Sequence, residues 1–432
     1  RKRSPVAWND AESLSRLAAE YGVNIRNLAA DNGVSVNDSL VVGQALVVRI
    51  PDTVHTVERG ETLSSVAAAY GVTALSLLRN NFWLKGSSRL TTGDELVISY
   101  KDNQKRGSFA VNSYAYPHIN SGLLRSQMPY FTYFTPFTYG IAADGGLVEL
   151  NDREMISIAK DYGTDTLLHL STLTEGGGFS SDRASMIFQN EDMRIRLIEE
   201  IMQTVEEKNF NGVDVDFEFI SPAEKYDYIQ FLQELRLRLN PQGKLLFSAV
   251  APKTYDEQPG VLYEGHDYAG IGAAVNFVLL MTYEWGYTYS EPMAVAPLPS
   301  VRRVVEYATT RIASNKLFMG VPTYGYDWVL PHIKGGPGAP SISPVEAVNL
   351  ARRYGADIQY DETAQSPWFR YTDDDGRLHE VWFEDARSIS AKLALANQFG
   401  LYGIGYWNAM RDFPQNLVVL NAEYDILNIS LL

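Results

Sequence analysis

The chain has 432 residues, of which 45% are hydrophobic, so it is long enough for two or three domains with sizeable cores. Its formal net charge is −15 at pH 7, and this charge is uneven: residues 1–106 carry +2 and the remainder carries −17. An acidic main domain argues against nucleic acid as a partner. No apolar run reaches the roughly 20 residues of a membrane span, so we expect no membrane partner either.

The sequence contains no cysteine, which excludes disulfides, thiol catalysis and Cys-ligated metals. Its histidines show no metal-binding spacing, and we interpret them as structural or surface residues: His55, His118, His169, His266, His332 and His379. We therefore expect no metal ion and no cofactor. No signal peptide is visible, but the chain begins with Arg1 rather than Met, so upstream residues can be missing and this absence is weak evidence.

The first hundred residues contain an internal repeat. Segment 13–23 recurs as 62–72, a shift of 49 residues, and segment 43–48 matches 93–98. Each copy has the pattern of a strand, a helix capped by Ser or Thr, a second helix and a strand. We expect two small modules, at residues 1–50 and 51–101.

The second copy, from Val57-Glu58-Arg59-Gly60-Glu61-Thr62-Leu63 onward, resembles the LysM module. The first copy departs from that pattern at residues 8–11, where the glycine of the module is missing. The resemblance implies affinity for glycans that contain N-acetylglucosamine. The alternative is that the modules are only spacers. If both bind, tethering raises the local concentration of substrate even when each affinity is weak.

After a polar connector at residues 101–107, strand patterns alternate with helix patterns up to the C-terminus. The candidate strands are 109–114, 130–139, 166–173, 212–219, 245–251, 276–283, 316–324 and 402–407. Eight strands with intervening helices predict an α/β fold, a closed (β/α)8 TIM barrel over residues 108–432, with its site at the C-terminal ends of the strands. The long stretch 327–384 before the last strand predicts a small α+β insertion, with a helix at 344–354 and a hairpin around 373–376.

The fourth candidate strand carries acids at every second position: Asp214, Asp216 and Glu218. Period-2 spacing places all three on one face, with neighbouring Cα atoms about 6–7 Å apart. Like charges this close cannot all ionise, so at least one acid should stay protonated near neutral pH, which prepares a general acid. The alternatives are a solvated acidic face on an edge strand, and part of a magnesium or calcium site.

The strand ends together resemble the family 18 glycoside hydrolases, the chitinases and their relatives, from about Ser108 to the C-terminus. The family signature Asp-x-x-Asp-x-Asp-x-Glu matches at the three acids and departs at Asn211, to which we assign no catalytic role. The resemblance implies a retaining, substrate-assisted hydrolysis in which Glu218 is the acid and base, Asp216 and Asp214 support it, and Tyr283 orients the acetamido group of the sugar. It also implies a set of substrate-binding residues: Trp407, Tyr324, Glu284 and Trp285.

Segments 281–287 and 292–297 are similar to the spore-germination enzymes of bacteria, which are cortex-lytic N-acetylglucosaminidases with two N-terminal LysM modules. This implies cleavage of N-acetylglucosaminyl β-1,4 bonds in peptidoglycan of the spore cortex, or in its fragments, at the spore coat, cortex or cell wall. Two alternatives stay open. They are a chitinase or chitooligosaccharide hydrolase, and a catalytically inactive glycan-binding protein. We expect a monomer.

Overall fold

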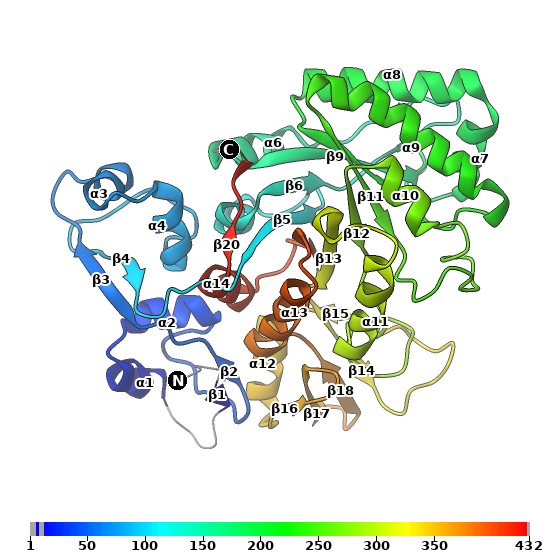
Figure 1. Cartoon of the computed structure of the whole chain (residues 1–432). Coiled ribbons are helices and arrows are strands. Elements are labelled where there is room, and N and C mark those ends of the chain that lie inside the picture. Colours follow the sequence, from blue (N-terminus) through cyan, green and yellow to red (C-terminus); the bar gives the residue numbers. More distant parts are fainter. Residues whose placement is uncertain (1–5, 8–12, 430–432) are drawn as a thin grey trace.

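The computed structural model describes residues 6–7 and 13–429, so the departure from the LysM pattern at residues 8–11 lies outside the described residues. Two small modules lie beside one large barrel (Figure 1). The elements of the first are β1 (Val6–Ala7), α1 (Leu14–Tyr21), α2 (Ile25–Asn32) and β2 (Ala45–Leu46). Those of the second are β3 (Pro51–Thr56), α3 (Leu63–Tyr70), α4 (Ala74–Asn80) and β4 (Glu95–Tyr100). The predicted strand–helix–helix–strand order is confirmed in both.

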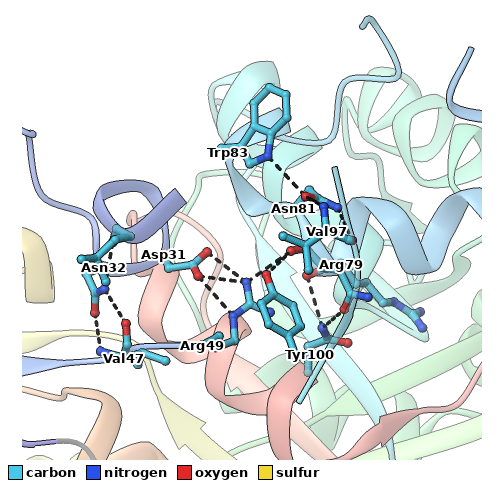
Figure 2. A network of polar contacts seen from close by, with 12 residues as sticks. Asp31, Asn32, Val47, Arg49, Arg79, Asn81, Trp83, Val97 and Tyr100 are labelled. Carbon is cyan, nitrogen blue, oxygen red and sulfur yellow. Dashed lines mark hydrogen bonds and ion pairs between the residues drawn. The ribbon is translucent and has the colours of Figure 1, made fainter. Parts of the chain in front are cut away.

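Each module is stabilised internally by a buried asparagine at an equivalent position. The side-chain amide of Asn81 donates to the carbonyls of Leu77 and Val97, and its Oδ1 accepts from the Val97 amide. Asn32 makes the same three bonds within the first module, two of them to Val47 (Figure 2). Each asparagine thus ties the end of the second helix to the last strand, which satisfies buried backbone groups that would otherwise lack partners.

The main domain is a closed parallel barrel. Its strands are β5 (Ser108–Ala115), β6 (Tyr133–Pro136), β9 (Asp165–Leu173), β10 (Gly212–Asp216), β11 (Leu245–Val250), β12 (Phe277–Leu280), β13 (Leu317–Pro322) and β19 (Gly403–Trp407). The sheet closes because β10 pairs with both β9 and β11, and β19 pairs with β5. The predicted TIM barrel is confirmed.

Helices pack around the outside of this barrel (Figure 1). They are α5 (Ser121–Gln127), α6 (Arg153–Asp161), α7 (Ser181–Gln189), α8 (Glu191–Glu207), α9 (Lys225–Leu239), α10 (Tyr268–Ala274), α11 (Leu298–Thr309), α13 (Ala386–Gln398) and α14 (Pro414–Glu423). A short strand, β20 (Asp425–Ile426), follows α14 and pairs with β5. None of the helices in the described residues is long and apolar enough to cross a membrane.

Apolar side chains fill the inside of the barrel. Tyr133, Phe247, Leu279 and Phe318 are each at most 4% exposed and form one cluster that also includes Tyr114. The barrel is therefore a packed core rather than a pore, as expected for eight strands. This cluster forms an apolar layer inside the barrel next to the carboxylates of β10.

The α+β insertion between β13 and β19 is also confirmed. It contains a five-stranded antiparallel sheet and one helix: β14 (Gly325–Val329), β15 (Ser341–Ile342), α12 (Pro344–Tyr354), β16 (Gln359–Asp361), β17 (Ser366–Thr372) and β18 (Leu378–Trp382). The helix occupies the predicted residues. Ser343 and Glu346 form a capping box at its start, Pro344 occupies its first turn, and Gly355 ends it with a left-handed φ of 62°.

Several predicted strands are too long, among them 316–324, of which only β13 (Leu317–Pro322) is a strand. Residues 130–139 divide into a 3-10 turn (Met128–Tyr130), β6, and a separate strand β7 (Tyr139–Ile141) that forms a hairpin with β8 (Leu147–Val148). β6 ends at Pro136, which has no N–H for the ladder. β12 ends at Leu280, before Tyr283, and β10 ends at Asp216, so the prediction that Glu218 lies on the strand is wrong. Beyond Asp216 the chain bends away, and Phe219 has a left-handed φ of 59°.

Arg49 connects the two modules to each other. Its guanidinium group forms a buried ion pair with Asp31 at 3.0 Å and lies 4.2 Å from the ring centre of Tyr100 (Figure 2). Arg79 of the second module then reaches the barrel, where its Nε donates to the carbonyl of Pro129 at 2.6 Å. These contacts join both modules and the barrel in one continuous polar network.

The first module also packs against the insertion. The backbone amide of Ile358 donates to the carbonyl of Val42, and Nε of Arg352 donates to the carbonyl of Ser39. Gly43 approaches Ile358 so closely that a Cβ at this position would lie 1.8 Å from the Ile358 carbonyl oxygen. This module is therefore held firmly against the catalytic domain.

Candidate active site

The three predicted acids meet at the C-terminal end of β10. Asp214 and Asp216 belong to the strand, and Glu218 follows two residues later. Asp214 is completely buried, whereas Asp216 and Glu218 are partly exposed at the mouth of the barrel. Oδ1 of Asp214 and Oδ1 of Asp216 are buried and have no hydrogen-bond partner in the part of the chain that the structure describes. A proton on one of these groups, or a donor from a ligand, would satisfy them.

Asp214 is held by Tyr114, a residue that the sequence interpretation missed. The Tyr114 hydroxyl donates to Oδ2 of Asp214 at 2.6 Å from within β5. Burial raises the pKa of Asp214 to about 6, although this hydrogen bond works in the opposite direction. A tyrosine in the first strand gives no local signal of this role, because the contact depends on how the barrel closes.

Asp216 faces His169 on the neighbouring strand β9. Nε2 of His169 lies 3.3 Å from Oδ2 of Asp216, and the histidine is 1% exposed. The interpretation of His169 as a structural or surface residue was therefore incomplete, because His169 is buried and belongs to the site. The available signal was its position on a strand next to the acidic one, but only the register, which pairs His169 with Asp214, brings it here.

Asp216 and Glu218 both hold a proton more tightly than a solvated carboxyl group does. Burial raises the pKa of both, and the negative charge of Asp216 raises the pKa of Glu218 further. These shifts favour a proton on one of the two acids, as expected for like charges in a dry site. No group of acids and histidines within residues 13–429 has the arrangement of a metal site.

Tyr283 and Trp407 lie close to this pair. Burial raises the pKa of Tyr283 well above its usual value, and the charges of Asp216 and Glu218 add to the effect. Trp407 ends β19, and its ring contacts Tyr114 with ring centres 5.6 Å apart. Both side chains also pack against one aromatic cluster, which places a hydroxyl donor and an indole face beside the acids.

Glu284 is bound by two tyrosines on the rim. Tyr324 and Tyr326 both donate to its Oε1, the second at 2.8 Å, and Tyr326 was not expected from the sequence. Burial raises the pKa of Glu284, while these two hydrogen bonds lower it. Trp285 is half-buried and packs against the main core of the barrel. Substrate-binding roles for Glu284, Tyr324 and Trp285 stay predictions.

A second histidine, also read from the sequence as structural or surface, shapes the turn that carries Glu218. Nε2 of His266 donates to the carbonyl of Phe217 at 2.8 Å, and Nδ1 accepts from the amide of Ala251 at 3.0 Å. These two bonds fix the tautomer of the ring. His266 therefore fixes the backbone between Asp216 and Glu218 from the loop that joins β11 to α10.

Comparison with known proteins decides the family. Residues 128–412 match the sequence model described as glycosyl hydrolases family 18, and residues 11–49 and 55–99 match the LysM domain. The chain belongs to family 18. It is therefore a glycoside hydrolase, and the acids at the end of β10 match the family signature on which the sequence interpretation relied.

Three relatives are close to this family 18 chain. The cortical fragment-lytic enzyme of Bacillus subtilis (strain 168) is 42% identical over 303 residues, which is 70% of each chain. The crystal structure of the Bacillus cereus spore cortex-lytic enzyme SleL is similar with a TM-score of 0.82 at 35% identity, and covers 98% of this chain and 99% of its own. The crystal structure of the Bacillus megaterium QM B1551 spore cortex-lytic enzyme SleL is similar with a TM-score of 0.81 at 37% identity, and 98% of each chain is covered.

Proposed function

We propose that this enzyme performs a retaining, substrate-assisted hydrolysis of N-acetylglucosaminyl β-1,4 bonds in bacterial peptidoglycan. The observation that carries the proposal is the placement of Asp216 and Glu218 side by side at the C-terminal end of β10, where burial raises the pKa of both and the charge of Asp216 raises that of Glu218 further. Glycoside hydrolysis needs such a proton on the leaving oxygen, and something that stabilises or traps the anomeric carbon. Here Glu218 is the proton donor.

The nucleophile is the substrate's own 2-acetamido group. Its carbonyl oxygen attacks the anomeric carbon while Glu218 protonates the departing glycosidic oxygen, which gives an oxazolinium ion and a free alcohol. Water then attacks the same carbon from the side that the leaving group vacated, and Glu218 takes its proton. The ring opens to restore the acetamido group, and the configuration at the anomeric carbon is retained.

The other side chains have supporting roles in this scheme. Oδ1 of Asp216 is buried and has no partner within the described part of the chain, so it can accept the acetamido N–H and orient the carbonyl oxygen for attack. Asp214 supports Asp216 electrostatically from below. The Tyr283 hydroxyl donates to the acetamido oxygen, and Trp407 offers an apolar face to the sugar ring.

The substrate assignment rests on the relatives. Proteins named cortical fragment-lytic or spore cortex-lytic enzymes match this chain, the two SleL structures over its full length. We therefore assign spore cortex peptidoglycan, or its fragments during germination, as the substrate, and the coat, cortex or cell wall as the place of action. The two LysM modules, at residues 1–50 and 51–101, bind the same glycan and keep the barrel at residues 108–432 close to it. The chain acts as a monomer without a cofactor.

Digestion of purified cortex peptidoglycan with the full chain tests this function. Mass spectrometry should find products with N-acetylglucosamine at the new reducing end. Glu218→Gln should still be pulled down by the glycan but should lose turnover by roughly 100-fold or more, because general acid catalysis contributes about that much. Release of products from chitin alone would contradict the substrate, and equal activity in the variant would remove Glu218 from the mechanism.

A further inference from the structure

His169 is a buried side chain that the scheme above does not use. Its Nδ1 lies 2.6 Å from Oγ1 of Thr138, and its Nε2 lies 3.3 Å from Oδ2 of Asp216. The ring is packed between Phe137 and Tyr114, with ring centres 4.7 and 5.7 Å away. The imidazole therefore has a fixed orientation, with one nitrogen aimed at a catalytic carboxylate.

The protonation state of His169 follows from its surroundings. Burial lowers the pKa of His169 to about 4, so the ring is neutral at neutral pH and carries a single N–H. Oγ1 of Thr138 also lies 2.9 Å from the Tyr139 carbonyl, but Oγ of Ser171 donates to that carbonyl at 3.2 Å, which leaves the Thr138 proton for Nδ1. With Thr138 as the donor to Nδ1, the N–H of the ring is at Nε2 and faces Asp216. The other tautomer would direct a lone pair at Oδ2, which suits only a protonated Asp216.

We propose that His169 is a positioning residue whose Nε2–H donates to Oδ2 of Asp216 when Asp216 is ionised, so that the shared proton stays on Glu218. The 3.3 Å separation is within reach of such a bond, which in unliganded sites is often long and tightens with substrate. This inference rests on the proposed function, because it assigns the acid form to Glu218.

A neutral donor suits this task better than a cation. A positively charged partner would hold the Asp216 carboxylate in an ion pair, whereas a neutral N–H on Oδ2 leaves Oδ1 to accept the acetamido N–H. The titratable groups that face His169 are Asp214, Asp216 and Glu218 from β10 and its extension, and Tyr114 from β5. Because all of these groups are acids, their negative charges oppose one another. Loss of the N–H donor of His169 therefore makes ionisation of the carboxyl groups less favourable.

Two substitutions separate positioning from packing. His169→Phe keeps an aromatic ring but removes the donor. Its kcat should fall roughly 10- to 100-fold with little change in KM, since a hydrogen bond to a charged group has about that effect. The acid limb of its pH–rate profile should move to higher pH. His169→Gln keeps an N–H donor and should recover most of both effects. A parent-like pH profile in His169→Phe, or equal losses in the two variants, would overturn the proposal.

Thr138→Val provides a test if His169→Phe fails to fold, because it leaves the imidazole in place and removes the donor to Nδ1. It should shift the acid limb in the same direction by a smaller amount. Nitrogen-15 NMR of the full chain gives a readout that needs no turnover: His169 should be neutral at pH 7 with its proton on Nε2. A proton on Nδ1 would overturn the proposal. If the parent hydrolyses no glycan, the proposed function fails while this spectrum still decides the tautomer.

Discussion

The hydroxyl of Tyr114 on β5 donates a 2.6 Å hydrogen bond to Oδ2 of Asp214 on β10, across the inside of the barrel. These strands are three positions apart in the barrel order, so the bond exists only once the sheet has closed. Asp214 is completely buried, and its Oδ1 has no partner among the described residues. The Tyr114 hydroxyl therefore favours the ionised form of Asp214, in opposition to the burial that raises its pKa.

Tyr114→Phe should lower kcat by roughly 10- to 100-fold, because it removes a hydrogen bond to a charged group. Loss of the donor disfavours the ionised form, so the pKa of Asp214 should rise and the acid limb of the pH–rate profile should move to higher pH. Tyr133→Phe is the matched control, since the hydroxyl of Tyr133 is buried and has no hydrogen-bond partner among the residues that the structure describes. It should retain parent activity and profile. An unchanged acid limb in Tyr114→Phe would contradict the role of this bond.

The pH dependence of kcat/KM should be bell-shaped. Burial and the charge of Asp216 raise the pKa of Glu218, so the acid form persists through neutral pH and is lost above it. Burial also raises the pKa of Asp216, so activity should fall again in acid as the second carboxyl group takes up a proton. The two apparent pKa values belong to the pair. Activity that still increases well above neutral pH would argue against a carboxylic acid as proton donor.

Asp31→Ala should lower the free energy of unfolding by about 3–5 kcal/mol, because it leaves the buried Arg49 guanidinium without its counter-ion. Asp374→Ala is the control. It breaks the Arg353–Asp374 pair, whose side chains are 63% and 73% exposed, and should change stability by about 0–1 kcal/mol. Urea unfolding of the full chain measures both. Equal midpoints for the two variants would show that the network of Figure 2 does not hold the modules together.

Gly43→Ala should loosen the first module from the insertion, whereas the repeat-related Gly93→Ala should not. Both glycines have left-handed φ angles, 82° and 94°, so an added Cβ introduces similar backbone strain at each. A Cβ at Gly43 would also lie 1.8 Å from the carbonyl oxygen of Ile358. A Cβ at Gly93 would have no neighbouring atom of the described residues within 4 Å. Limited proteolysis should therefore cleave Gly43→Ala faster around residues 33–44. The same cleavage rate in both variants would contradict the docking.

Local patterns were sufficient for the architecture. Alternating strands and helices predicted the barrel, and the helical pattern of residues 344–354 predicted α12 with the bounds that the structure has. The alternating acids also located the cluster of carboxyl groups at the end of β10. The ends of strands were less predictable: period-2 spacing continues through Glu218, but the bend after Asp216 depends on the bond from His266 to the Phe217 carbonyl, which comes from a distant part of the chain.

The missed residues share one property. Tyr114, His169 and Tyr326 reach the site through the register of neighbouring strands or through the insertion, and a single sequence does not encode this register locally. The modules show the same limit. Gly43 and Gly93 occupy equivalent positions in the repeat, yet only the former is packed against the catalytic domain.

Inhibition by a thiazoline analogue of N-acetylglucosamine tests the central claim most directly, because this compound imitates the cyclised intermediate that the acetamido group forms. Transition-state and intermediate analogues bind far more tightly than substrates. We predict competitive inhibition with an inhibition constant at least tenfold below the KM of the matching substrate, and a loss of that affinity in Asp216→Ala. An active preparation that the thiazoline does not inhibit, even well above the KM, would contradict substrate-assisted catalysis by Glu218.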